Sequence, residues 1–155
     1  MIGAVETFLT AVSTTKSVLE ALSPLVKEAK GKKRSLLLEL QHNVNVIGLY
    51  TEGNSPIDKV VARLQTRHVE AALDSGFDFN LVKKGKIKKR ITDGVLQYER
   101  YVGWTTEQLF SGIYLRIKEL QTIVEIDPHN EQYRKDVRLL NIRKLMILLL
   151  KHIRS

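Results

Sequence analysis

The stretch "WTTEQL", residues 104–109, marks the start of a helix more clearly than any other part of the chain. Thr105 can accept a hydrogen bond from the backbone N–H of Gln108, and the Gln108 side chain can reach back to the backbone of Thr105, as in a capping box. Trp104 and Leu109 flank this pattern and can form a hydrophobic staple. Apolar residues then recur at helical spacing, at Leu109, Ile113, Ile117, Leu120 and Val124. The sequence therefore predicts an amphipathic helix that begins at this box.

Helical spacing of apolar residues also recurs on both sides of this segment. It marks stretches at 5–26, 37–47, 57–72 and 87–102. Pro24 is expected to kink or interrupt the first stretch, and Ser55-Pro56 to start the third. Asp127-Pro128 is expected to start a last helix by the same proline rule. Because the turns are short, neighbouring helices should run antiparallel, so we expect an all-α antiparallel bundle of five to six helices in a single domain, residues 1–155.

The last of these helices contains a run, 145–150, that is apolar on every side. Such a segment is usually either the central helix of a bundle or a helix that faces a partner. We therefore predict that Leu145, Met146 and Leu149 bind a protein partner. Because symmetric dimers are the commonest oligomers, a second copy of the chain is one such partner.

Positive charge is concentrated in the stretch "LVKKGKIKKRI", residues 81–91. Its basic residues are Lys83, Lys84, Lys86, Lys88, Lys89 and Arg90. They supply six of the +8 formal net charge, which leaves +2 for the remainder of the chain. The basicity is therefore a local feature.

A second basic group surrounds the turn "GKKR", residues 31–34, with Lys27 and Lys30 close by. If the helices alternate in direction, this turn and the segment 75–86 lie at the same end of the bundle. We predict that Lys32, Lys33 and Arg34 join the 83–90 cluster there to bind a polyanion, with Glu28 as the main acid nearby. Nucleic acid, anionic lipid and an acidic protein face are the candidate ligands. The alternative is a solvated surface that keeps the protein soluble.

The sequence lacks the usual marks of catalytic and metal chemistry. It has no cysteine, which excludes disulfides and thiolate ligands and suits a reducing cytoplasm. The histidines, His42, His68, His129 and His152, lack the spacing of metal ligands. There is no glycine-rich phosphate loop and no apolar stretch of eighteen residues. We therefore expect no metal, no cofactor and no small-molecule substrate.

The segment "RLQTRH" places His68 five residues after Arg63. It is similar to the R-x4-6-H motif of the HEPN ribonuclease superfamily, which is also all-helical. The resemblance implies metal-independent RNA cleavage at a dimer interface, with Arg63 steadying phosphate and His68 transferring a proton. His68 also falls on the apolar stripe of its predicted helix, which favours a packed core histidine instead.

The N-terminal stretch "MIGAVETFLTAV" is rich in small and aliphatic residues. It resembles in character the first helix of membrane-active four-helix domains of the HeLo type. That resemblance implies insertion of this helix into an anionic membrane. The alternative is an amphipathic helix that packs in its own core.

Together these features favour a non-enzymatic interaction or scaffold protein that acts through a basic end and an apolar helix face. An HEPN-like ribonuclease that uses Arg63 and His68 is one alternative function. A membrane-active effector with an amphipathic N-terminal helix is the other.

Overall fold

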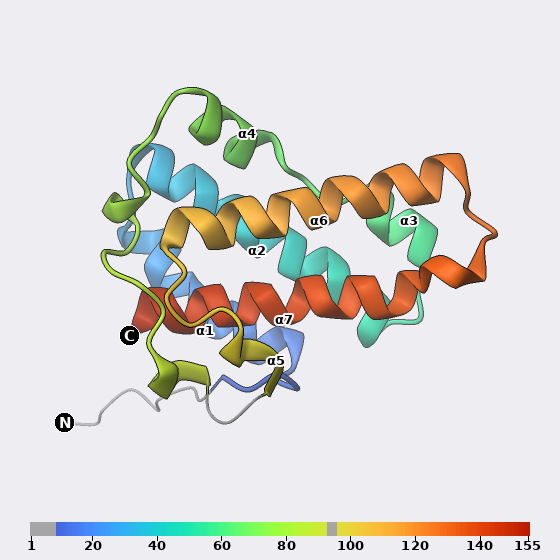
Figure 1. Ribbon diagram of the computed structural model, residues 1–155, viewed down its shortest axis with the longest axis horizontal. Coiled ribbons are helices and arrows are strands. Elements are labelled where there is room, and N and C mark those ends of the chain that lie inside the picture. The colour runs from blue at the N-terminus through green and yellow to red at the C-terminus, as the bar shows by residue number, and fades with distance from the viewer. Residues whose placement is uncertain (1–8, 93–95) are drawn as a thin grey trace.

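The computed structural model describes residues 9–92 and 96–155, which fold into helices joined by short loops (Figure 1). The predicted all-α bundle of five to six helices is confirmed, because the described residues form six α-helices of six or more residues and one of four residues. In chain order the elements are α1 (Thr15–Glu28), α2 (Gly31–Thr51), α3 (Ile57–Ala62), α4 (Arg67–Asp74), the 3-10 turns η1 (Phe79–Leu81) and η2 (Lys89–Thr92), α5 (Leu96–Glu99), α6 (Thr106–Ile126), the 3-10 turn η3 (Glu131–Tyr133) and α7 (Lys135–Arg154).

Helix α7 is the centre of the bundle. It lies beside α6 and also contacts α1, α2, α3 and η2 (Figure 1). Every residue from 145 to 150 is buried, which explains why this run is apolar on all sides. The prediction that Leu145, Met146 and Leu149 face a partner is therefore wrong, because this chain's own helices cover them.

Helix α1 begins at Thr15, later than the apolar spacing predicted. The Thr14 side chain accepts a hydrogen bond from the backbone N–H of Ser17 and so caps the helix. Val12, which belongs to the predicted helical stretch 5–26, precedes the helix and is 87% exposed. Val5 and Phe8 lie outside the described residues. Pro24 does not interrupt the helix, which continues to Glu28.

The third predicted helix, 57–72, is broken into α3 and α4 at residues 63–66. Side chains of α2 and α6 satisfy the backbone of this break. The Asn43 side chain forms two hydrogen bonds with the backbone of Gln65. Its Nδ2 donates to the Gln65 carbonyl and its Oδ1 accepts from the Gln65 N–H, each at 2.8 Å. His42 Nε2 lies 3.1 Å from the Arg63 carbonyl, and Gln121 donates to the carbonyls of residues 61 and 64.

Glu39 of α2 completes this arrangement by capping α4. Its carboxylate accepts hydrogen bonds from the backbone N–H groups of His68, at 2.7 Å, and Val69, at 3.1 Å. These are free N–H groups of the first turn of α4, where the helix dipole also favours negative charge. Glu39 is only 3% exposed, so it is a buried cap supplied by a distant helix.

A long fourth helix, predicted at 87–102, is absent from the described part of that range. Instead, Ile87 pairs with the chain just before α6: its N–H donates to the Trp104 carbonyl and its carbonyl accepts from the Gly103 N–H, both at 2.9 Å. The chain continues through η2 to the single-turn α5. Ile87 and Ile91 are buried, although neither lies in an α-helix. Val95, in the same predicted stretch, lies outside the described residues.

The predicted capping box of α6 is present. The Thr105 hydroxyl accepts from the Gln108 N–H at 3.2 Å, and the Gln108 side chain accepts from the Thr105 N–H at 2.8 Å. The last helix, in contrast, begins at Lys135 and not at Pro128. The intervening chain forms η3 and then passes through Arg134, whose φ of 50° lies in the left-handed region.

Candidate polyanion-binding end

Both lysine-rich segments lie at one end of the bundle. Lys32 Nζ donates a hydrogen bond to Ser75 Oγ at 2.8 Å, which joins the α1–α2 turn to the loop after α4. In Figure 1 this turn, the chain of residues 77–86 and the C-terminal turn of α7 lie together on the left. We call this region the basic end; its cations are Lys27, Lys30, Lys32, Lys33, Arg34, Lys83, Lys84, Lys86, Lys88, Lys89 and Arg90.

The cations of the basic end are available to solvent. All are exposed except Lys33 and Lys83, which are half-buried. Two further cations, Lys151 and Arg154, were not predicted; they reach this end because α7 runs towards it. More acidic residues lie here than the sequence indicated, because Asp74, Asp78 and Glu107 join Glu28 at this end. The basic side chains still outnumber the acidic ones.

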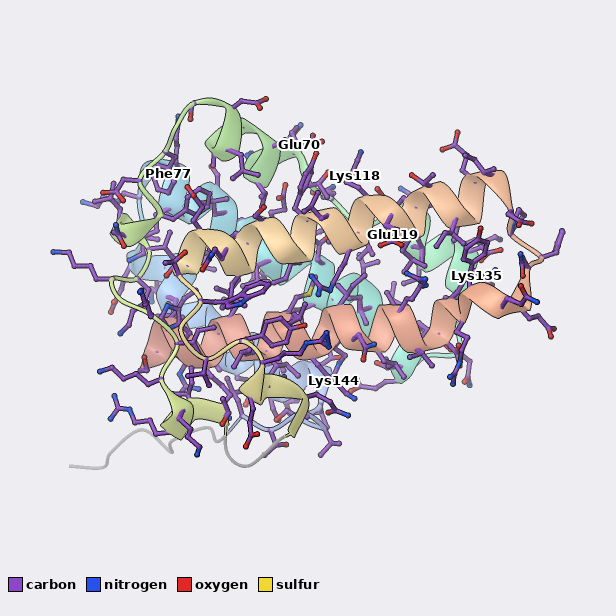
Figure 2. The ribbon with its side chains drawn as sticks, in the orientation of Figure 1. Glu70, Phe77, Lys118, Glu119, Lys135 and Lys144 are labelled. Carbon is purple, nitrogen blue, oxygen red and sulfur yellow. The ribbon has the colours of Figure 1, made fainter. Side chains whose placement is uncertain are left out.

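A buried underside holds the lysine-bearing segment in place. Val82, Ile87 and Ile91 are buried in the core. The lysines between them are exposed except Lys83, which is half-buried. Phe79 packs on Phe77, which is labelled in Figure 2, with ring centroids 5.3 Å apart. It also packs on Phe110 of α6, at 5.4 Å. The segment is therefore anchored, although little of it is helical.

Polar contacts join the same segment to α6 and α7. The Thr106 hydroxyl donates to the Lys83 carbonyl at 2.7 Å and lies 2.9 Å from His152 Nε2. The Thr106 hydroxyl has one proton, which it donates to the Lys83 carbonyl, so it must accept a hydrogen bond from His152. His152 therefore carries a proton on Nε2. His152 is 1% exposed; burial, and then the charge of Lys83, lower its pKa below the ordinary 6.5. The Lys83 ammonium donates to the carbonyl of Ser155.

Arg63 and His68 do not share one helix. Arg63 is exposed at the C-cap of α3, and His68 is half-buried in the first turn of α4. The break at 63–66 separates them, so the two side chains do not lie on the one continuous helix that the stretch 57–72 predicted. The packed core histidine of this protein is His152, which contacts Thr106 across the bundle.

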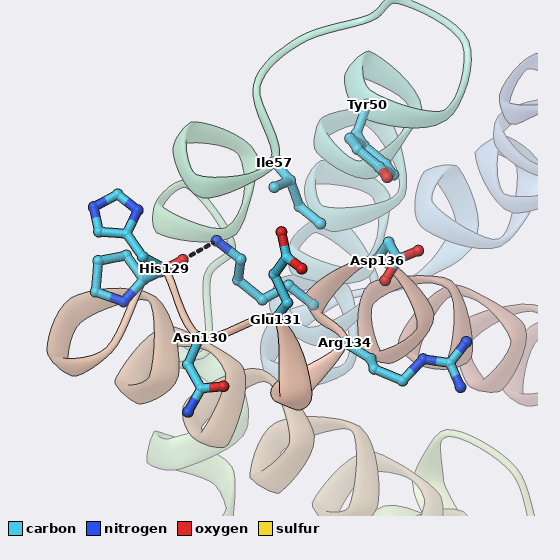
Figure 3. Close-up of a pocket in the computed structure, with 9 residues that line it drawn as sticks. Tyr50, Ile57, His129, Asn130, Glu131, Arg134 and Asp136 are labelled. Atoms are coloured by element: carbon cyan, nitrogen blue, oxygen red, sulfur yellow. Dashed lines mark hydrogen bonds between the residues drawn. The ribbon is translucent and has the colours of Figure 1, made fainter.

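A hollow of about 590 Å³ lies beside η3 and the first turn of α7 (Figure 3), at the other end of that helix from the basic end. It is lined by Tyr50, Ile57, residues 128–131 and residues 134–136. Lys135 crosses it and donates to the Pro128 carbonyl and to the Asp58 carboxylate, each at 2.6 Å. The ammonium of Lys135 is therefore already bound by acceptors of this protein.

Two further findings concern the described residues alone. No three histidine, aspartate or glutamate side chains among them are arranged to hold a metal ion. No helix within these residues combines the length and hydrophobicity that a membrane span requires. In comparisons with known proteins, no family, no curated protein and no solved structure matches this chain.

Proposed function

We propose that this protein is a non-enzymatic binding module whose basic end holds the phosphate backbone of nucleic acid. The observation that carries the proposal is the meeting of two lysine-rich segments, distant in sequence, on one exposed end of the bundle. Clustered cations raise the local concentration of a polyanion and release its condensed counterions on binding.

The residue types favour contact with phosphates over reading of bases. Lysine predominates over arginine, and its ammonium acts as a point charge, without the planar fork that reads guanine. Of the aromatic side chains beneath this end, Phe77 packs against Phe79, and Phe79 packs against Phe110 of α6. They are therefore poor platforms for stacking unpaired bases. Duplex nucleic acid, bound with little sequence preference, is the ligand that fits best.

Salt-dependent binding tests this proposal. Affinity for a fluorescein-labelled 20-base-pair duplex is measured by fluorescence polarisation between 50 and 200 mM salt. We expect a linear fall of log K with log salt, because each neutralised phosphate contributes a slope of about 0.9. The triple variant Lys84→Glu, Lys88→Glu and Lys89→Glu should lose about two to three from that slope.

A variant with the same net charge provides the control. Lys16→Glu, Lys59→Glu and Lys118→Glu change exposed lysines that lie outside the basic end. This control should keep most of the salt slope. Equal losses in the two triple variants would show that net charge alone drives binding, and would contradict the proposal. So would binding only to vesicles that contain phosphatidylserine, with no retention of duplex.

A further inference from the structure

A groove lined by residues of α6 and α7 lies between these two helices, which run side by side in Figure 1. One part of it, about 350 Å³, is lined by Leu115, Arg116, Glu119, Arg138, Asn141 and Ile142. A second part, about 290 Å³, extends over α5. Both are lined by Arg116 and Asn141, so they form one continuous surface, which we call the α6–α7 groove.

The α6–α7 groove carries an excess of positive charge. Its one acid, Glu119, is paired with Arg138 at 3.1 Å. Arg100, Arg116 and Lys144 also line it, and none of them forms an ion pair with a carboxylate among residues 9–92 and 96–155.

The arginines of the groove are held in position by neighbouring groups. Arg116 donates to the Gly112 carbonyl at 3.0 Å and to the Tyr101 hydroxyl at 3.3 Å. The Arg100 guanidinium lies 5.5 Å from the centre of the Tyr101 ring. Groups fixed in this way lose less conformational entropy when they bind a carboxylate.

The groove also has an apolar component. Leu115 is 60% exposed at its rim, and the buried residues Ile142 and Leu145 lie in its floor. A leucine exposed to this extent is more easily covered by an apolar side chain than by a phosphate backbone. The combination of cations and an exposed leucine distinguishes this groove from the basic end.

We infer that the α6–α7 groove docks an acidic amphipathic segment of a partner protein. Carboxylates of that segment contact Arg100, Arg116 and Lys144, and an apolar side chain covers Leu115. The inference rests on charge complementarity and on the apolar rim. It is independent of the proposed nucleic-acid function.

A synthetic peptide tests the inference directly. The probe is a fluorescein-labelled 18-residue peptide with leucine and glutamate at helical spacing; its control has glutamine in place of every glutamate. Binding to the full chain is followed by fluorescence polarisation. Lys144→Glu and Leu115→Asp should each weaken binding of the acidic peptide about three- to tenfold, and the glutamine peptide should bind more weakly than the acidic one.

Lys118→Glu is the matched control, because Lys118 lies on α6 beside Glu70, at 3.9 Å, and outside the groove lining (Figure 2). It should leave peptide affinity unchanged. Circular dichroism melting of each variant checks that the fold is kept. The basic-end variant Lys84→Glu should keep peptide affinity, which separates this site from the proposed function.

Three outcomes would overturn the inference. One is unchanged peptide affinity in folded Lys144→Glu and Leu115→Asp. Another is equal weakening by Lys118→Glu, which would show attraction by net charge only. The third is concentration-dependent self-association, measured by sedimentation, that Lys144→Glu abolishes while the peptide does not bind; this would assign the groove to a second copy of the chain.

Discussion

Glu39→Gln is the sharpest test of how this fold is specified, because one buried carboxylate satisfies two N–H groups of α4. The glutamine side chain keeps one oxygen, but its NH₂ group faces the second N–H and cannot accept from it. Loss of one hydrogen bond to a charged acceptor costs about 1.5–3 kcal/mol. Loss of the charge at a helix N-terminus adds about 0.3–1 kcal/mol. At 3% exposure little of this is screened by water, so we expect destabilisation of about 2–4 kcal/mol.

Urea unfolding followed by circular dichroism measures this change, with Glu125→Gln as the control, since Glu125 is exposed on α6. Hydrogen exchange gives a second readout: the amides of His68 and Val69 should lose protection before the rest of the core. A Glu39→Gln variant within about 0.5 kcal/mol of the wild type, with both amides still protected, would refute the capping role.

Three further predictions concern packing and protonation. A Cβ at Gly48 would lie 2.5 Å from Thr15 Oγ1, so Gly48→Ala should cost about 1–3 kcal/mol in urea unfolding, and Thr15→Ala in the same chain should recover part of it. The pKa of His152 is lowered, so as the pH falls through 6.5 the unfolded chain gains a proton that the folded chain resists. The urea concentration at the unfolding midpoint should therefore decrease when the pH is lowered from 7.5 to 5.5, and it should decrease less in His152→Gln. Arg143, which is buried, donates to the carbonyls of residues 11 and 13, so Arg143→Met should speed hydrogen exchange at residues 9–14 while α6 stays protected.

The start of α6 was predictable because its determinants are neighbours in sequence. Thr105 and Gln108 are three residues apart, and their reciprocal hydrogen bonds need no other part of the chain. The apolar spacing also predicted the all-α class correctly. It could not separate a central helix from a partner-facing one, because both are apolar on every side, and that ambiguity explains the error over Leu145.

The break between α3 and α4 was not predictable from its own residues. Residues 63–66 contain no proline and no glycine, so local propensity favours a continuous helix. The cause lies in α2, where Asn43 offers the backbone of Gln65 alternative hydrogen bonds and Glu39 caps the new helix start at His68 and Val69. Such polar residues look like surface positions in the sequence, and only the tertiary structure shows that they are buried.

The break also determines where the candidate site lies. Because α4 starts anew at Arg67 and packs against both α2 and α6, it leads the chain to the end of the bundle that the next segment crosses (Figure 1). Ser75 then meets Lys32, and the lysine-rich segment follows within ten residues. The same path brings Asp74 and Asp78 to this end, which sequence reasoning did not anticipate. The position of the basic end therefore depends on the buried polar contacts of α2, so Glu39→Gln should weaken the proposed nucleic-acid binding without changing any surface charge.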